Sequence, residues 1–382
     1  MRLLVSAGDA SGELHAAAVV DALRTRAAGL DVAALGGSAL EKAGARILVP
    51  QAELAIGGLV EVLGDLGRVR RAWARMTRAL AEERPDVVML VDSPDFNMPL
   101  AKRAKRLGLR VLWFISPQLW AWRRGRVRKI AARADLLAAI FPFELAVYAG
   151  TPLRAEFVGH PLVDRLAPLA ARTRAECRAA LGLDAERSLV ALFPGSRRNE
   201  LRNNLGLHVD AARALHAQDQ RVAFALAAAP SLAREEVERA LAALRLPQLM
   251  ELRIVADRAH VLMRAADAVL AKPGTTTLEA ALLGTPQVVT ARVPELTWQL
   301  VRRLVSTRYW AMPNLIAERE VVPELVQHEA DSQRVAAALR GLLAGPARDE
   351  QLAGLARVRA ALGGGGAAQR VAELMLELAA RR

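Results

Sequence analysis

The stretch LLVSAGDASGE, residues 3–13, decides the fold. An apolar run ends at Ala7, a polar turn with Gly8 and Gly12 follows, and a helical pattern begins. Glycines in a turn from strand to helix let a ligand approach the backbone, and a helix N-terminus favours an anion. An ordinary tight turn capped by Ser11 explains the pattern equally well. The spacing is not G-x-G-x-x-G, so the stretch is not a dinucleotide fingerprint.

Outward from this stretch, short apolar runs alternate with helical patterns along the whole chain. This alternation predicts two doubly wound α/β domains with parallel sheets and a cleft between them. The expected strands are 3–7, 32–35, 87–92, 110–115, 136–141 and 156–158, then 188–193, 222–227, 252–255, 268–271 and 287–290. Helical spacing marks 68–83, 99–107 and 297–305.

A polar stretch at 165–173 interrupts the alternation, so we expect domains at 1–167 and 168–366. The glycine run Gly363–Gly366 precedes a last amphipathic helix at 368–380. The terminal segment 367–382 is a candidate to pack back onto the first domain.

The composition limits the class of protein. Of 382 residues, 53% are apolar, and a single cysteine, Cys177, excludes a disulfide framework. The six histidines are scattered, so we expect no metal and no cofactor. The first residues do not resemble a signal peptide, and no apolar run reaches the length of a membrane span. We therefore expect a cytoplasmic protein.

The formal charge is +13, and 48 of the 53 basic residues are arginine. This excess indicates an anionic partner such as a nucleotide, a phospholipid or a nucleic acid. In the segment SPQLWAWRRGRVRKI, residues 116–130, Trp120 and Trp122 stand among arginines. Such a segment suits an anionic lipid surface or a nucleic acid, or it is a solvated basic face. No nucleic-acid-binding fold signature accompanies it, so we expect no nucleic-acid partner.

The segment VDSPDFN, residues 91–97, supplies a candidate general base. Asp92 ends a hydrophobic strand, where a carboxylate faces the ligand edge of a parallel sheet. We predict that Asp92 is catalytic and that Asp95 caps the next helix, with Pro99 in that helix's first turn.

Two turns in the second half predict a nucleotide diphosphate site. In LFPGSRRNE, a strand runs into Gly195 and Ser196 before a helix that begins near Arg198, with Arg197 as a cationic donor. In AKPGTTTLEA, a strand ends before Gly274, Thr275 and Thr276, and Glu279 lies one turn into the helix. Each turn is alternatively an ordinary helix cap.

Taken in order, these motifs resemble the lipid-A-disaccharide synthase family. The resemblance rests on SAGDASGE, GGLVEVLG, DSPDFN, SPQLWAWRRGRVRKI, FPFE, FVGHPLVD, PGSRRNE and RRLVSTRYWAMPNLIAEREVVPEL. It implies a GT-B fold and an inverting hexosyltransferase. The donor would be UDP-2,3-diacylglucosamine, the acceptor 2,3-diacylglucosamine 1-phosphate, and the products a β-1,6-linked disaccharide 1-phosphate and UDP.

Carried over by motif, Asp92 would be the general base. The residues expected to bind the substrate or UDP are Gly12, Gly195, Ser196, Arg197, Gly274, Thr275, Thr276, Glu279 and Asn314. The sequence departs from the family pattern in two places: the acids of SAGDASGE are exchanged, and Lys272-Pro273 replaces a small serine-type turn. The alternative function is another GT-B enzyme acting on a UDP-sugar, such as a glycolipid or peptidoglycan glycosyltransferase or an epimerase.

Acylated substrates predict contact with a membrane. The segment IGGLVEVLGDLGRVRRAW, residues 56–73, has apolar helical spacing and flanking arginines. We expect Leu59, Val60, Leu63, Leu66, Trp120 and Trp122 to face an anionic surface, on the inner side of the cytoplasmic membrane. A core-facing helix is the alternative for the first four. A homodimer is left open.

Overall fold

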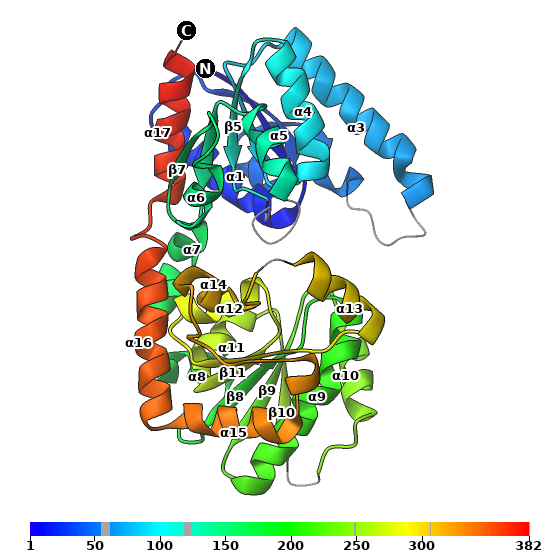
Figure 1. Ribbon diagram of the computed structural model, residues 1–382, viewed down its shortest axis with the longest axis vertical. Coiled ribbons are helices and arrows are strands. Elements are labelled where there is room, and N and C mark those ends of the chain that lie inside the picture. Colours follow the sequence, from blue (N-terminus) through cyan, green and yellow to red (C-terminus); the bar gives the residue numbers. More distant parts are fainter. Residues whose placement is uncertain (55–61, 118–123, 248–249, 306, 382) are drawn as a thin grey trace. The chain divides into compact units, whose positions relative to one another are not determined.

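The computed structural model describes residues 1–54, 62–117, 124–247, 250–305 and 307–381. The chain divides into two compact units. Unit 1 comprises Met1–Pro161 and Leu362–Arg382, and unit 2 comprises Leu162–Ala361. Helix α7 (Pro161–Ala170) spans the position where the sequence predicts a boundary. Each unit is an α/β layer structure with helices on its sheet (Figure 1).

The sheet of unit 1 has seven strands in the order β3-β2-β1-β4-β5-β6-β7, and all its neighbours pair in parallel. The strands are β1 (Arg2–Ala7), β2 (Asp31–Gly36), β3 (Arg46–Pro50), β4 (Val87–Val91), β5 (Arg110–Phe114), β6 (Leu136–Ala139) and β7 (Arg154–Phe157). Its helices are α1 (Ala10–Arg24), α2 (Ser38–Lys42), α3 (Val62–Glu82), α4 (Pro94–Arg106), α5 (Val127–Ala131), α6 (Glu144–Tyr148) and α17 (Ala367–Ala380).

The sheet of unit 2 has six parallel strands in the order β10-β9-β8-β11-β12-β13. They are β8 (Leu189–Phe193), β9 (Ala223–Ala228), β10 (Leu252–Ala256), β11 (Ala268–Ala271), β12 (Gln287–Ala291) and β13 (Glu324–Val326). The helices are α8 (Arg174–Leu181), α9 (Arg198–Gln218), α10 (Arg234–Ala242), α11 (Ala259–Ala265), α12 (Thr275–Leu282), α13 (Glu295–Leu304), α14 (Met312–Ala317), α15 (Ser332–Leu343) and α16 (Pro346–Ala361).

The central strands read as unbroken apolar runs because helices cover both of their faces. All five residues of β4 and all five of β8 are buried. Each expected strand is present, so the predicted doubly wound α/β class is confirmed in both units. The prediction missed β3 and β13, which are edge strands. Both are partly exposed, so their apolar pattern is weak.

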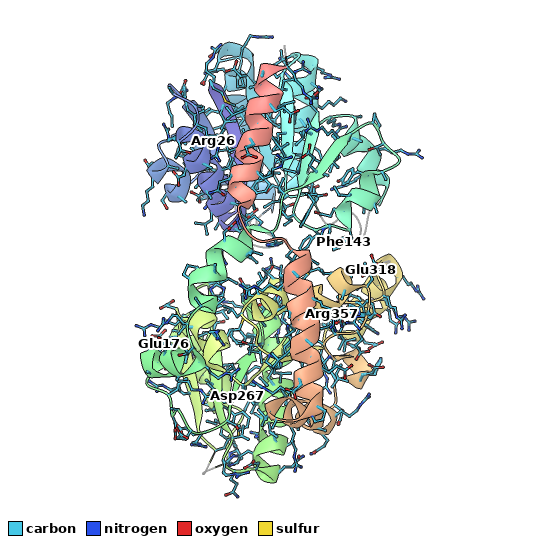
Figure 2. All side chains as sticks on the ribbon, turned by 90° about the vertical axis from the view of Figure 1, so that its left-hand side faces the viewer. Arg26, Phe143, Glu176, Asp267, Glu318 and Arg357 are labelled. Carbon is cyan, nitrogen blue, oxygen red and sulfur yellow. The ribbon has the colours of Figure 1, made fainter. Side chains whose placement is uncertain are left out.

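Helix α17 belongs to unit 1 although it follows unit 2 in the chain. It packs on α1 and against β4 and β5. In Figure 2, Arg26 lies beside α17, where its guanidinium is 3.7 Å from the carboxylate of Glu373. The chain passes from unit 2 back into unit 1 at residues 361–362. The next residue, Gly363, has a φ of 90°, a left-handed conformation that glycine adopts readily.

The structure corrects two predictions about α4. This helix begins at Pro94, so Pro99 lies inside it and not in its first turn. Asp95 is not the cap, because Ser93 holds that position. The Asp95 side chain is exposed and its carboxylate is 3.1 Å from the guanidinium of Arg126. The helix starts earlier because residues Asp92 and Ser93 turn the chain through left-handed conformations directly after β4.

Asp267, labelled in Figure 2, links helix α8 to strand β8 near the start of unit 2. Its carboxylate is 2.5 Å from the guanidinium of Arg178 and 3.4 Å from that of Arg174, both on α8. It also accepts a hydrogen bond of 2.8 Å from the backbone N–H of Leu189, at the start of β8. Because the Arg178 side chain is only 6% exposed, burying its positive charge would be costly without this partner.

We predict that Asp267→Ala lowers the free energy of unfolding by about 3 kcal/mol, since it leaves a buried guanidinium without its counter-ion. Urea denaturation measures the loss. The matched control is Asp210→Ala, which removes an exposed carboxylate 2.7 Å from Arg213. The control should cost less than about 1 kcal/mol. Equal losses in the two variants would contradict the assignment.

Candidate functional site

In unit 1 the turns after β1 and β4 lie side by side, because these strands are neighbours in the sheet. A Cβ on Gly8 would lie 2.7 Å from the Ser93 hydroxyl oxygen, so any larger residue would force the Ser93 side chain to move. Asp9 then caps α1, accepting a hydrogen bond of 2.8 Å from the backbone N–H of Gly12. The cap is therefore Asp9 and not Ser11.

Gly12, an expected substrate contact, has an internal role in the structure. It is buried, and its N–H is used by Asp9. A Cβ here would come within 3.2 Å of a Val91 methyl group, so glycine lets α1 pack close to β4. The other acid of the motif, Glu13, also acts internally. Its carboxylate accepts hydrogen bonds from the N–H groups of Ala39 and Leu40 at the start of α2.

Asp92, the predicted base, stands at the carboxyl end of β4 in a strained turn. Asp92 and Ser93 both have a φ of 41°, a region that non-glycine residues seldom adopt. The fully buried Asn97 holds the turn, because its amide nitrogen donates to the carbonyls of Val91 and Asp92 at 3.0 and 2.9 Å. Its amide oxygen accepts from the Ser6 hydroxyl at 2.7 Å.

The electrostatic environment of Asp92 suits proton transfer near neutral pH. Burial raises the pKa of Asp92 to about 6, and the charge of Asp9 adds to this effect against the lowering influence of the Ser93 N–H. A carboxylate with this pKa is ionised at pH 7 yet is a stronger base than an ordinary aspartate. Perturbed carboxyl groups of this kind are concentrated at functional sites.

Glu144, in the FPFE motif, is a second perturbed carboxyl group that the sequence did not identify as a site residue. It is buried and accepts hydrogen bonds of 3.1 Å from the N–H groups of Ile140 and Phe141. Burial raises the pKa of Glu144 to about 8 against those two donors, and the charge of Asp92 contributes. Burial therefore favours the protonated form of Glu144. On the same helix, Tyr148 lies 2.8 Å from the buried Ser116 hydroxyl.

In unit 2 the two predicted phosphate turns differ from each other. At the start of α9, the Glu200 carboxylate accepts hydrogen bonds of 2.9 and 3.4 Å from the N–H groups of Ser196 and Arg197. A Cβ on Gly195 would lie 2.3 Å from that of Glu200, so this glycine makes room for the carboxylate. This turn thus contains its own anion. The Arg197 side chain is 84% exposed, and its guanidinium is 3.8 Å from the Glu200 carboxylate.

The start of α12 has no such internal carboxylate among the described contacts. Gly274 is the residue before the helix, with a φ of 133° and no side-chain cap. The N–H groups of the first helical turn, at Thr275 and Thr276, have no intrahelical partner. The Lys272 ammonium is 3.1 Å from the Glu200 carboxylate, so this lysine joins the two turns. It belongs to the second of the two departures from the family pattern noted in the sequence.

Glu279 and Asn314 are both engaged within unit 2. One carboxylate oxygen of Glu279, Oε1, is 2.9 Å from the His260 ring and 3.3 Å from the Arg165 guanidinium. The amide of the fully buried Asn314 bonds to the backbone of Val321 and Val322 and to Glu324. Both ends of this amide are occupied, so Asn314 positions the segment 310–324, and the geometry does not support its predicted direct contact with the substrate.

Among the residues that the structure describes, no three metal-binding side chains cluster. The described helices include none that is long and apolar enough to cross a membrane. Of the predicted membrane-facing residues, Leu59, Val60, Trp120 and Trp122 lie outside the described residues. Leu63 and Leu66 belong to α3, and their side chains are outside the description as well.

Solved structures of low sequence identity share this fold. UDP-GlcNAc 2-epimerase from Neisseria meningitidis, bound to UDP-GlcNAc, matches with a TM-score of 0.67 and 14% identity, covering 99% of this chain and 100% of that one. MurG from Acinetobacter baumannii matches with a TM-score of 0.61 and 14% identity, covering 98% and 99%. This chain has two parallel-sheet α/β units and matches these neighbours over nearly its whole length, so the predicted GT-B class is confirmed.

The sequence comparisons are more specific. The family model described as lipid-A-disaccharide synthetase matches residues 3–366. The lipid-A-disaccharide synthase of Geobacter metallireducens is 41% identical, covering all of this chain and 98% of the relative. That of Anaeromyxobacter dehalogenans (strain 2CP-C) is 42% identical, covering 98% and 97%. The chain belongs to the lipid-A-disaccharide synthetase family and is a hexosyltransferase.

The environment of Asp92 gives a test that needs no substrate. We expect the Asp92 carboxyl group of the wild-type protein to titrate near pH 6. Carbon-13 NMR measures this titration. Asp9→Asn should move it to lower pH, because it removes a neighbouring negative charge while asparagine still caps α1. The control is Asp21→Asn, which makes the same change at an exposed position on the same helix. An unchanged titration in Asp9→Asn would contradict the Coulombic link.

Proposed function

We propose that the protein transfers the diacylglucosamine group of UDP-2,3-diacylglucosamine to 2,3-diacylglucosamine 1-phosphate. The products are the β-1,6-linked lipid A disaccharide 1-phosphate and UDP. Membership of the synthase family over nearly the whole chain supports the reaction. The observation that supports the mechanism is Asp92, a strained, half-buried carboxylate whose pKa is raised to about 6.

The chemical step is an inverting displacement. The 6-hydroxyl oxygen of the acceptor attacks the anomeric carbon of the donor and forms the new C–O bond. Asp92 takes the hydroxyl proton, and the bond from the anomeric carbon to the β-phosphate oxygen breaks. General-base assistance of this kind is worth about 10²–10⁴ in rate. The hydrogen bonds from Asn97 to the backbone of Val91 and Asp92 fix the turn that carries the Asp92 carboxylate, so its position does not depend on bound substrate.

The leaving diphosphate belongs in unit 2, at the start of α12. The N–H groups of Thr275 and Thr276 and the positive end of the helix dipole would offset the charge that develops on UDP. Lys272 adds a full positive charge beside Gly274, since a Cβ there would lie 3.4 Å from its ammonium nitrogen. Arg197, exposed at the start of α9, would contact the diphosphate from the turn between β8 and α9.

Glu279 would bind the ribose. Its two internal contacts both use Oε1, which leaves the second carboxylate oxygen as an acceptor for a hydroxyl group. We also propose that the enzyme docks on the inner face of the cytoplasmic membrane, because acyl chains leave a bilayer only at a cost of about 0.8 kcal/mol per exposed CH₂. The membrane contact expected of six residues remains a prediction from the sequence: Leu59, Val60, Leu63, Leu66, Trp120 and Trp122.

Replacing the base tests the mechanism. We predict that Asp92→Asn lowers turnover by about 10²–10⁴-fold. UDP affinity should stay within about twofold, because the base does not hold the nucleotide. UDP release and calorimetry supply the two measurements. The matched control is Asp95→Asn, an exposed carboxylate three residues later, which should leave both unchanged. A fully active Asp92→Asn enzyme would remove this residue from the mechanism.

The nucleotide contacts are tested separately. Lys272→Met, Arg197→Ala and Glu279→Ala should each weaken UDP binding by about tenfold or more, as expected for a lost hydrogen bond to a charged group. Calorimetry with UDP alone measures this without acylated substrates. Arg198→Ala is the control, since Arg198 is exposed and its guanidinium is 3.1 Å from Glu236. Unchanged affinity in all three variants would place the nucleotide elsewhere.

A further inference from the structure

Helix α13 of unit 2, labelled in Figure 1, carries an exposed apolar ridge. Within the described part of the chain, three large hydrophobic side chains are exposed: Leu14 at 48%, Leu296 at 88% and Leu300 at 59%. Leu296 and Leu300 lie four residues apart on α13, so they are neighbours on one face of this helix. The core of the unit is formed by buried apolar side chains from its sheet and its other helices.

The opposite face of α13 fixes which way the ridge points. Trp298 packs against Trp310, with ring centroids 5.6 Å apart, and Val301 on the same side is partly buried. In helical projection, Leu296, Leu300 and Arg303 share one face, and Trp298 and Val301 lie on the other. The two leucines therefore point outward, because Trp298 packs against Trp310 on the opposite face of the helix.

The charges on α13 define the kind of surface that would cover this ridge. The single acid of the helix, Glu295, is half exposed, and its carboxylate accepts hydrogen bonds from Gln299 at 2.6 Å and Gln327 at 3.1 Å. The last turn holds Arg302 and Arg303, both exposed. An apolar ridge that ends in arginines is typical of a helix lying in the interface of an anionic bilayer.

We propose that α13 is a membrane-docking helix, with Leu296 and Leu300 inserted at the acyl boundary of an anionic membrane and Arg303 at its headgroups. The proposal rests on the proposed function in one respect, namely that the acylated substrates lie in a bilayer. It adds a second contact, in unit 2, to the surface that the sequence predicts in unit 1.

The test is co-sedimentation of the full chain with vesicles of phosphatidylcholine, with and without phosphatidylglycerol. Leu296→Ser with Leu300→Ser should weaken partitioning into the mixed vesicles by at least about tenfold. The matched control, Leu14→Ser, changes an exposed leucine of unit 1 and should leave partitioning unchanged. Arg303→Gln should reduce binding to the mixed vesicles at low salt and have little effect at high salt. Thermal melts check folding, and the single Leu296→Ser variant replaces the double one if that unfolds.

Three results would overturn the proposal. One is that the leucine variants and the wild type partition equally into the vesicles. The same conclusion follows if the wild type does not bind vesicles at all. Another is a change of oligomeric state in analytical ultracentrifugation with vesicle binding unaltered, which would assign the ridge to a second copy of the chain. The third is a raised KM for detergent-dispersed substrates with normal vesicle binding, which would assign it to a substrate acyl chain. UDP release from detergent-dispersed substrates tests the proposed function independently.

Discussion

The hydrogen bonds of Asn97 are the constraint on which the geometry of unit 1 depends. This buried amide joins the end of β1, through Ser6, to the end of β4, through the carbonyls of Val91 and Asp92. Two successive left-handed residues are costly for side chains other than glycine, at about 1–3 kcal/mol each. The clamp holds Asp92 in this conformation, and the glycine at position 8 leaves space for Ser93.

A second theme is the use of carboxylates to satisfy the N–H groups at helix starts. Asp9 does so for α1, Glu13 for α2 and Glu200 for α9. Each internal anion fills the position that a phosphate would otherwise take, because both ligands accept hydrogen bonds from the same unpaired groups. The start of α12 differs, since glycine precedes it and Lys272 stands beside it. This difference supports the proposed placement of the diphosphate at the start of α12.

Most of the fold was predictable because the information is local. Buried parallel strands read as continuous apolar runs, and the turns after them are marked by glycine and by acids. The edge strands β3 and β13 were missed because they are short and partly exposed, which weakens the apolar pattern. The start of α4 was misplaced at Pro99 because a proline inside a helix resembles a proline in the first turn. The true start is set by the strained residues before it, which no local pattern announces.

The sequence by itself determined the α/β class, the family resemblance, and the position of Asp92 at the end of a buried strand, since these follow from periodicity and short motifs. Only the tertiary structure decided which motif residues are available to a ligand. Glu200 and Ser196 are near in the chain, but Lys272 and Glu200 meet only because β8 and β11 are neighbours. The raised pKa of Asp92 likewise depends on burial and on Asp9, 83 positions earlier in the chain. Burial and charge proximity arise from long-range packing, and for that reason the chemistry of these groups appears only in the folded chain.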